Sequence, residues 1–313
     1  MNYQNHEQSR ESCPVCRSII KESTLFLDRN LDLAKIDGYS YSSRKKPEFM
    51  NHKLVRCAKC RLVYATSTPT EESLLDEYSK SLYNSKLEDE FAALTYFDAL
   101  RSHRPYLLES NGGRALDLGS GAAVFLEQLL RSGFKELIGI EPSISAFTHN
   151  NLENQSDIRI DQKYDRDNFA NNSLDLFSSF MTFEHILYPL EMMIEAYRVL
   201  KPGGIIALAL HNIDSNVNKI LGRLSPVIDI EHLQLFSKKS AYHMADQAGF
   251  AKINITNYAN TYPIYYWIKL LPITPALAKQ IYRILDKTPY AEKAISLPAG
   301  NFFLTAEKPN KLK

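Results

Sequence analysis

The clearest pattern in the chain is an alternation of short apolar runs with amphipathic stretches in its central part. Residues 115–118 form an apolar run that predicts a strand, and the glycine turn 119–121 follows it. Apolar positions at helical spacing over residues 124–130 predict an amphipathic helix, and residues 137–140 predict a second strand that ends on Glu141. This order predicts the βαβ unit of a nucleotide-binding sheet, in which glycines allow the backbone to approach a ligand closely.

The same alternation continues towards the C-terminus and predicts an α/β fold with a mostly parallel sheet. The run 205–210 is almost wholly apolar, as expected of a strand buried on both faces. Residues 71–109 and 263–296 show helical spacing, the first with one break and the second rich in aromatic residues. The other expected strands are 157–160, 174–180, 252–258 and 301–306, and the other expected helices are 143–152, 190–200 and 238–248.

Composition and charge limit the classes of protein that this chain can represent. With 44% hydrophobic and 23% charged residues, its 313 positions suffice for one large domain with an appendage, or for two. A formal net charge of +1 gives no electrostatic reason to expect a nucleic-acid partner. The polar N-terminus shows no signal peptide, so we expect a cytoplasmic protein with residues 1–12 disordered. The longest apolar stretch, 262–271, is too short to span a bilayer, although residues 262–285 offer a peripheral membrane or dimer contact if they do not pack on their own domain.

All four cysteines fall in two C-x-x-C pairs, which predicts a metal site. They are Cys13, Cys16, Cys57 and Cys60. Two such turns present four thiolates to one ion, typical of a tetrahedral Zn²⁺ site with a structural role, because no position is left for water or substrate. A redox motif would explain one pair but not both, and disulfides are not expected without a secretion signal. The forty residues between the pairs require an insertion, whose basic run 44–46 we interpret as solvated rather than phosphate-binding.

Two departures from the dinucleotide fingerprint change the ligand expected at the glycine turn. The pattern G-x-G-x-x-G would need a third glycine where Val124 stands, and Asp117 lies two residues before the first glycine. This carboxylate would repel a pyrophosphate but not a ligand that carries an ammonium and a sulfonium. Glu141 lies twenty residues beyond Gly121, near the spacing of an acid that binds a ribose. An ordinary βα turn in another doubly wound sheet remains the alternative.

The sequence D-L-G-S-G, followed by an acid at the end of the next strand, resembles motif I of the class I S-adenosylmethionine (SAM)-dependent methyltransferases. Residues 172–175, 183–186 and 198–204 resemble the fourth strand and the approach to the fifth strand of that family. The resemblance implies a Rossmann-like, seven-stranded, mostly parallel sheet with SAM as the cofactor. It places these residues at the methionine part, the ribose, the adenine or the pocket floor: Asp117, Gly119, Ser120, Gly121, Glu141, Pro142, Tyr164, Asp165, Phe180 and Met181.

The front of the chain resembles a zinc-binding module that precedes such domains in bacterial proteins of sugar, antibiotic and cell-surface polysaccharide biosynthesis. This resemblance implies a zinc-ribbon-like module over residues 13–68 and a helical linker or lid over 69–110. The methyltransferase domain would then span 111–313, with a helical insertion at about 263–296. Helices before motif I often cover the cofactor in this fold, which makes Tyr78 and Tyr83 candidates for substrate contact.

Methyl transfer needs an aligned acceptor and, for a hydroxyl, a base. His185 and His232 are the acid/base candidates, since each follows the C-terminal end of a strand by this interpretation; a structural hydrogen bond is the alternative for both. In sugar C-methyltransferases with a similar zinc module, a pair like Glu231–His232 lies at the active site, two residues after a tyrosine. Here Asp229 takes the place of that tyrosine, and we expect no room for the further C-terminal domain of those enzymes, so O- and C-methylation both remain open.

The function predicted from these features is SAM-dependent methyl transfer to a small molecule, such as a sugar or glycoconjugate precursor. A nucleic-acid methyltransferase or binder that uses the zinc module as a reader is the first alternative, and the neutral charge disfavours it. A catalytically silent scaffold that keeps the fold is the second. The motif I residues argue against loss of the cofactor, though not against loss of chemistry.

Overall fold

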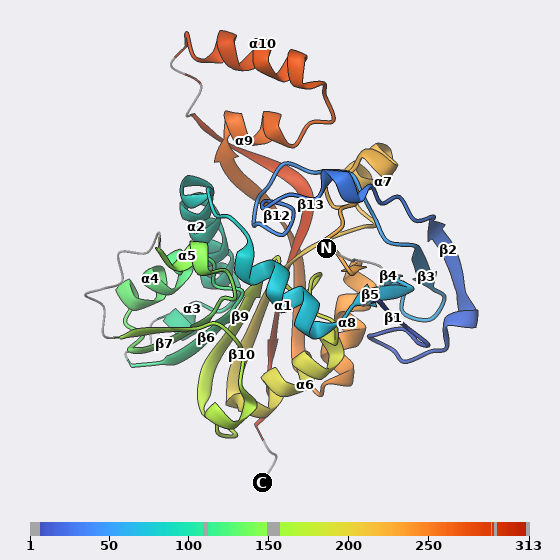
Figure 1. The fold of residues 1–313 in the computed structure, drawn as a ribbon. Helices are drawn as coiled ribbons and strands as arrows, with labels where there is room; N and C mark the ends of the chain where they lie inside the picture. The colour runs from blue at the N-terminus through green and yellow to red at the C-terminus, as the bar shows by residue number, and fades with distance from the viewer. Residues whose placement is uncertain (1–6, 109–111, 149–156, 289, 291–292, 311–313) are drawn as a thin grey trace.

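Residues 7–108, 112–148, 157–288, 290 and 293–310 are described by the computed structural model of the chain. A seven-stranded sheet with the order β12-β13-β10-β9-β6-β7-β8 forms its centre (Figure 1). Strands β8, β7, β6, β9 and β10 are parallel, and β13 runs antiparallel to both of its neighbours. The predicted Rossmann-like fold is therefore confirmed. The strands are β6 (Arg114–Leu118), β7 (Glu136–Ile140), β8 (Ile158–Asp161), β9 (Leu174–Phe180), β10 (Leu200–His211), β12 (Ala251–Pro263) and β13 (Ala294–Glu307).

Helices cover both faces of the sheet, because alternate side chains of each buried strand point to opposite faces. In β10, Ile206 and Leu208 pack with helices α6 and α8, whereas Ile205 and Ala207 pack on the side of α2 and α4. The α-helices are α1 (Glu71–Lys80), α2 (Lys86–His103), α3 (Pro105–Leu108), α4 (Val124–Arg131), α5 (Ile144–Thr148), α6 (Pro189–Val199), α7 (Asn216–Leu221) and α8 (Lys238–Gln247), and the short 3-10 helices are η2 (Ile20–Glu22), η3 (Leu33–Lys35), η5 (Arg166–Asn168) and η6 (Gly222–Leu224). Helix α5 is the described part of the helix expected over 143–152, and residues 149–152 lie outside the described residues.

A second sheet joins the N-terminal part of the chain to the central domain. Its four strands have the order β11-β4-β3-β2, with β2 (Ser23–Leu27), β3 (Leu54–Cys57), β4 (Val63–Ala65) and β11 (Gln234–Leu235). Strand β11 comes from the second half of the chain and begins two residues after His232. Backbone hydrogen bonds therefore join β4 to the segment that directly follows His232, a predicted site residue.

The prediction that residues 1–12 are disordered is wrong for residues 7–12. Strand β1 (Glu7–Ser9) pairs with β5 (Ser67–Pro69), sixty residues away in sequence. The Arg10 guanidinium donates hydrogen bonds to the carbonyl groups of Leu187 and Leu233. This polar segment is ordered because backbone groups far along the chain accept or donate its hydrogen bonds.

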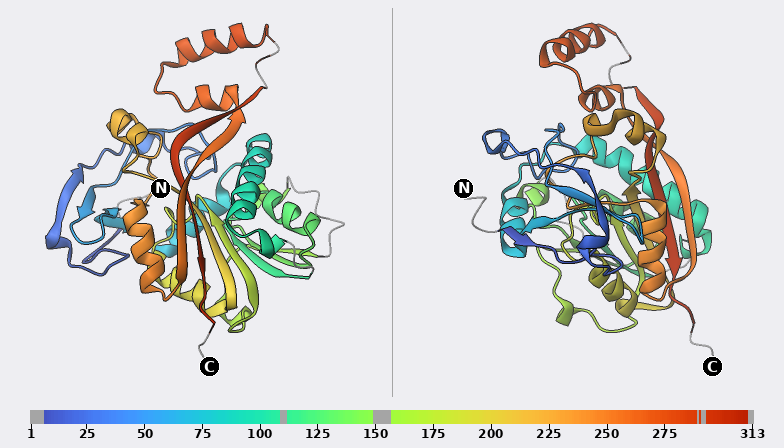
Figure 2. Two further views of the ribbon diagram at one scale, coloured as in Figure 1. Left: turned by 180° about the vertical axis from the view of Figure 1, so that it is seen from behind. Right: turned by 90° about the vertical axis from the view of Figure 1, so that its right-hand side faces the viewer.

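Beyond the sheet, β12 and β13 continue as a two-stranded arm that carries a helical hairpin away from the rest of the molecule (Figures 1 and 2). Helix α9 (Ile264–Lys269) buries Tyr266, whereas α10 (Pro275–Leu285) buries no side chain and stacks Tyr282 on Tyr265 at 5.1 Å. Packing onto the domain thus holds for α9 only. Within the described part of the chain, no helix is both long and apolar enough to cross a membrane.

Candidate active site and metal site

The glycine turn after β6 adopts a conformation that residues with a side chain rarely adopt. Gly119 and Gly121 have φ angles of +79° and +51°, in the left-handed region that favours glycine. A Cβ atom on Gly119 would lie 2.1 Å from Oγ1 of Thr182, which follows strand β9. The turn therefore needs glycine both for its backbone angles and for its close approach to the neighbouring loop.

Two carboxylates flank this turn at the carboxyl ends of neighbouring strands. Asp117 accepts a hydrogen bond from the Ser178 hydroxyl at 2.7 Å, and burial raises its pKa to about 7. Glu141 accepts hydrogen bonds from the backbone N–H groups of Gly121 at 2.8 Å and Ser143 at 2.9 Å. Burial also raises the pKa of Glu141. Two poorly solvated carboxylates favour a ligand that brings positive charge.

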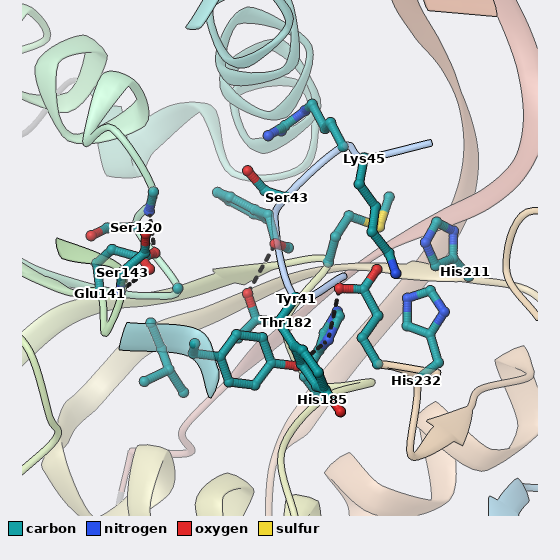
Figure 3. Close-up of a pocket in the computed structure, with 18 of the residues that line it drawn as sticks. Tyr41, Ser43, Lys45, Ser120, Glu141, Ser143, Thr182, His185, His211 and His232 are labelled. Atoms are coloured by element: carbon teal, nitrogen blue, oxygen red, sulfur yellow. Dashed lines mark hydrogen bonds and ion pairs between the residues drawn. The ribbon is translucent and has the colours of Figure 1, made fainter. Parts of the chain in front are cut away.

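One cavity of about 1030 Å³ extends from the glycine turn to a group of three histidines. Figure 3 shows Ser120, Glu141 and Ser143 on one side of it and His185, His211 and His232 on the other. The residues predicted for SAM that line this cavity are Asp117, Gly119, Ser120, Gly121, Glu141, Pro142, Tyr164, Phe180 and Met181. Among the described residues, the buried hydroxyl of Ser120 has no hydrogen-bond partner, so a ligand at the turn would find a free donor and acceptor.

Asp165 is the one predicted cofactor residue that lies outside the cavity lining. Its carboxylate accepts a hydrogen bond from the backbone N–H of Asp167 and caps the short helix η5. Its neighbours Gln162 and Lys163 line the cavity instead. The sequence of this loop does not predict which side chains face the cavity, because side chains of an irregular loop do not alternate with a fixed period.

The three histidines come from three segments and approach one another closely. The ring centroids of His185 and His232 are 4.9 Å apart, and those of His211 and His232 are 5.4 Å apart. His211, at the end of β10, was not predicted as a site residue. Its position after an apolar strand is the same signal that identified the other two.

Hydrogen bonds fix the orientation of these rings. Nδ1 of His232 lies 2.9 Å from the carbonyl oxygen of Val227, which can only accept, so Nδ1 carries the proton and Nε2 is left with the lone pair. Nδ1 of His211 similarly lies 2.8 Å from Oδ1 of Asn301. Burial lowers the pKa of both imidazoles, and neighbouring histidines add to the effect at His232. His232 is therefore neutral near pH 7 and able to accept a proton at Nε2.

Glu231 and Tyr78 complete this group around His185. The Tyr78 hydroxyl lies 2.8 Å from Nδ1 of His185, and a Glu231 carboxylate oxygen lies 3.9 Å from the same nitrogen. Burial raises the pKa of Glu231 to about 8 and lowers that of His185 to about 3. Tyr83, the second tyrosine predicted at the lid, lines the cavity and donates its hydroxyl to Asp89.

The four cysteine side chains form one buried cluster. The sulfur atoms of Cys13 and Cys60 are 3.6 Å apart, those of Cys16 and Cys57 are 3.4 Å apart, and all four lie within 4.8 Å of one another. A tetrahedral zinc ion with Zn–S bonds of about 2.3 Å needs sulfur atoms about 3.8 Å apart. The cluster could therefore hold a metal ion with little adjustment.

Matching backbone turns support each pair of cysteines. The residue after the second cysteine, Arg17 or Arg61, has a φ of 58° or 73° and donates its N–H to the carbonyl of the first cysteine, at 3.0 Å or 3.1 Å. The Ser18 hydroxyl lies 3.1 Å from the Cys16 sulfur and 3.2 Å from the Cys57 sulfur. Such turns, with a hydroxyl near the sulfur atoms, are typical of ligands arranged for one ion.

The basic run of the insertion between the pairs is not solvated as a whole. The Arg44 guanidinium pairs with Asp89 of α2, and the Lys45 side chain is only 4% exposed. Both residues line the cavity, whereas Lys46 is exposed. The prediction of a solvated run is wrong because its charged partners lie on remote segments.

A mostly parallel sheet with one antiparallel strand inserted between two of the others, and with a glycine turn and an acid at its carboxyl edge, is typical of the class I methyltransferase fold. The family described as "Methyltransferase domain" matches residues 90–255, more than half of the chain. The chain belongs to this family: it is a class I SAM-dependent methyltransferase, with SAM as its cofactor. A search of curated proteins gives no match.

Several solved structures are similar to this chain. One is a SAM-dependent methyltransferase of Thermotoga maritima, described as a possible histamine N-methyltransferase, at 18% identity and a TM-score of 0.46 over 76% of this chain and 97% of that one. Another is phosphoethanolamine N-methyltransferase 2 of Haemonchus contortus in complex with SAM, at 17% identity and a TM-score of 0.47 over 78% of this chain and 63% of that one. A third, at 18% identity and a TM-score of 0.46 over 73% of this chain and all of that one, is a putative methyltransferase of Haloferax volcanii in complex with the activator Trm112.

Proposed function

We propose that the protein methylates a sugar-like small molecule, at a hydroxyl or a carbon atom, in the cavity that joins the glycine turn to the histidines. The observation that carries this proposal is the continuity of the cavity, which gives a donor end and an acceptor end to one space. Bound SAM supplies an electrophilic methyl group. The protein must then hold the acceptor in line and take up its proton.

The residues at the glycine turn fit SAM. Asp117 and Glu141 provide negative charge and acceptor oxygens for its ammonium and ribose hydroxyls, and the free hydroxyl of Ser120 adds one more partner. Glycine at 119 and 121 lets the backbone approach the ligand. The residues assigned from motif I would thus bind the donor, while Tyr164 and Phe180 would pack beside it.

At the acceptor end, we assign the role of general base to His232. Its Nε2 carries the lone pair because Nδ1 donates to Val227. Glu231 lies 3.9 Å from Nδ1 of His185, whose ring adjoins that of His232, and its carboxylate would stabilise the positive charge that develops when the proton arrives. A buried neutral imidazole gains most from such a neighbouring carboxylate.

The chemistry of the lining favours a neutral, hydroxyl-rich acceptor. Aromatic and amide side chains line the cavity, and aromatic faces pack on sugar rings, whereas the amides of Asn218 and Asn301 already bond to other protein groups. They include Asn218, Asn260, Asn301, Tyr262, Tyr266 and Trp267. Arg44 and Lys45, which line the cavity, are already paired with carboxylates, which disfavours a nucleic acid or another polyanion.

For the cysteine cluster we propose a structural Zn²⁺ ion, in a module of about residues 13–68 that precedes a lid of 69–110 and the domain 111–313. The module shares its sheet with β11, so we assign the ion an architectural role for the acceptor end. A metal assay of the purified protein tests this directly. One zinc ion per chain is expected, and a folded N-terminal part after complete chelation would contradict it.

The decisive test of the function is turnover with candidate sugar acceptors in His232→Ala and Gly119→Arg variants. Loss of a general base costs about 10²- to 10⁴-fold in kcat, so His232→Ala should lose activity while binding SAM normally. Gly119→Arg should lose both. Full turnover by His232→Ala would refute the base assignment, whereas SAM binding by Gly119→Arg would refute the cofactor site.

A further inference from the structure

Helices α7 and α10 present large apolar side chains to solvent at one end of the molecule. Figures 1 and 2 show α7 beside the base of the arm that carries α9 and α10. Ile220 of α7 is 85% exposed, and Leu224 in the 3-10 helix η6 that follows is also exposed. On α10, Leu277 and Ile284 are exposed and seven residues apart, so they lie on the same side of the helix. Such a group of exposed apolar side chains is typical of an interaction surface.

The same two segments concentrate positive charge. Residues 216–224 and 264–288 contain six basic residues and one acidic residue, a net charge of +5, whereas the whole chain has a net charge of +1. The ion pairs of the described residues involve none of these six, which are Lys219, Arg223, Lys269, Lys279, Arg283 and Lys287. The one acid, Asp286, accepts a hydrogen bond from the Tyr265 hydroxyl. The charge of the cations is therefore available to a partner.

The cations border the apolar side chains of α10. Lys287 follows Ile284 by three residues and Arg283 by four, and residues at these spacings are neighbours on a helix surface. An aliphatic ridge bordered by long basic side chains fits a bilayer surface, where the aliphatic groups enter the interface and the cations meet anionic headgroups. Two copies of such a face would bring like charges together, which disfavours a symmetric dimer.

The cavity of the candidate active site extends to this end of the molecule. Val217 and Leu221 of α7 line it, as do Trp267 of α9 and the two leucines that follow α9, Leu270 and Leu271. This part of the lining is apolar, in contrast to the histidine group. An acceptor that reached from the histidines to α7 and α9 would place an apolar portion there.

We propose that residues 216–224 and 264–288 form a docking face for an anionic lipid bilayer, and that the acceptor is a glycolipid whose sugar reaches the histidines. The apolar part of this acceptor would leave the cavity between α7 and α9. The docking goes beyond the proposed function, whereas the nature of the acceptor rests on it. The two parts therefore need separate experiments.

The docking is tested by flotation of the wild-type protein with vesicles, without SAM or acceptor. One set of vesicles is pure phosphatidylcholine, and the other is an equimolar mixture with phosphatidylglycerol. The protein should bind the anionic vesicles more tightly, and the binding should weaken as salt is added, because salt screens the attraction.

Two double variants then separate the charges from the apolar side chains. Each basic side chain near an anionic surface contributes about fivefold to binding, so Arg223→Gln with Lys287→Gln should weaken binding about 25-fold. Ile220→Ser with Ile284→Ser should weaken binding by about tenfold or more, because two exposed aliphatic groups no longer enter the interface. The matched control is Lys21→Gln with Leu25→Ser, two exposed residues near the second sheet, and it should bind like the wild-type protein.

Three results would overturn the docking. They are failure of the wild-type protein to bind anionic vesicles, equal binding by all the variants, and self-association that Ile220→Ser with Ile284→Ser abolishes in a protein that binds no vesicles. The last result would assign the face to a second copy of the chain.

The nature of the acceptor is tested by turnover of one sugar in two forms, free in solution and linked to a dialkyl lipid in the anionic vesicles. The wild-type protein should methylate the lipid-linked form faster. Both double variants should lose at least about tenfold with this form and retain wild-type turnover of the free sugar. Equal turnover of the two forms by the wild-type protein would overturn the glycolipid assignment. Methylation of neither form would instead overturn the proposed function, while flotation still decides the docking.

Discussion

The two ends of the cavity differ in how the chain builds them. The donor end comes from one stretch, residues 114–142, in which strand, turn, helix and strand follow one another. The acceptor end combines Lys45, Tyr78, His185, His211 and the pair 231–232, which meet only in the folded chain. The donor end therefore depends on local geometry, and the acceptor end depends on how distant segments are held. Each prediction below separates these two dependences.

The largest effect is expected at the donor end, from Gly119→Ala. The added Cβ would meet Thr182 at 2.1 Å on a backbone with positive φ, so SAM affinity should fall by about 100-fold or more. Gly222→Ala is the control, because Gly222 has a φ of +53° but open space around its Cβ position. Calorimetry should show normal SAM affinity for the control and little for Gly119→Ala. Equal affinities would mean that the turn does not contact the donor.

Removal of the metal should affect the acceptor end more than the donor end. A chelator would release both ends of the insertion and, through β4, strand β11 beside His232. We expect turnover to fall at least about tenfold while SAM affinity changes by less than about threefold, because none of the four cysteines lines the cavity. Added Zn²⁺ should restore turnover. If turnover and SAM affinity fall together, the two ends of the cavity are not independent.

SAM affinity should depend on pH through Asp117. Burial raises the pKa of this carboxyl to about 7, and a cationic ligand binds its ionised form. Below pH 7 the Asp117 carboxyl must lose its proton before SAM binds, so the apparent Kd for SAM should rise by up to about tenfold for each unit that the pH falls. Above pH 8 the Kd should no longer change. Asp117→Asn should bind more weakly with a flat profile. A wild-type profile that is already flat between pH 6 and 8 would contradict this role.

A smaller effect is expected from Tyr78→Phe, which removes the hydroxyl 2.8 Å from Nδ1 of His185. Loss of one hydrogen bond that orients a buried ring costs about 1 kcal/mol, or about fivefold in kcat, with SAM affinity unchanged. Tyr106→Phe is a suitable control, because Tyr106 is 52% exposed. A change in SAM affinity without a change in kcat would place Tyr78 at the donor end instead.

The smallest effect is expected from two exposed residues of α10, and a buried residue of α9 serves as the contrast. Leu277 and Ile284 of α10 are 46% and 67% exposed, so their replacement by serine should change the free energy of unfolding by less than about 0.5 kcal/mol. Tyr266→Ala in α9 removes a buried ring and should cost about 3 kcal/mol. Thermal melts compare the three. If residues 262–285 form the predicted membrane or dimer contact, the serine variants should bind vesicles or self-associate more weakly than the wild-type protein, while their turnover of a soluble acceptor stays the same.

The same contrast explains what could be predicted from the sequence. The βαβ unit and the two cysteine turns were accessible because each is defined by residues within a short window. The burial of Lys45 was not, because its partner Asp229 lies 184 residues away and a basic run resembles a solvated loop. Order at residues 7–12 likewise depends on a strand sixty residues away. His211 could have been included, since it follows a predicted strand.

The central claim is that the glycine turn binds SAM rather than a dinucleotide. Calorimetric titration of the metal-loaded wild-type protein with SAM, and separately with NAD, tests it most directly. The account predicts one SAM bound per chain, no heat of binding with NAD, and loss of the SAM signal in Gly119→Arg. Tight binding of NAD without binding of SAM would contradict it.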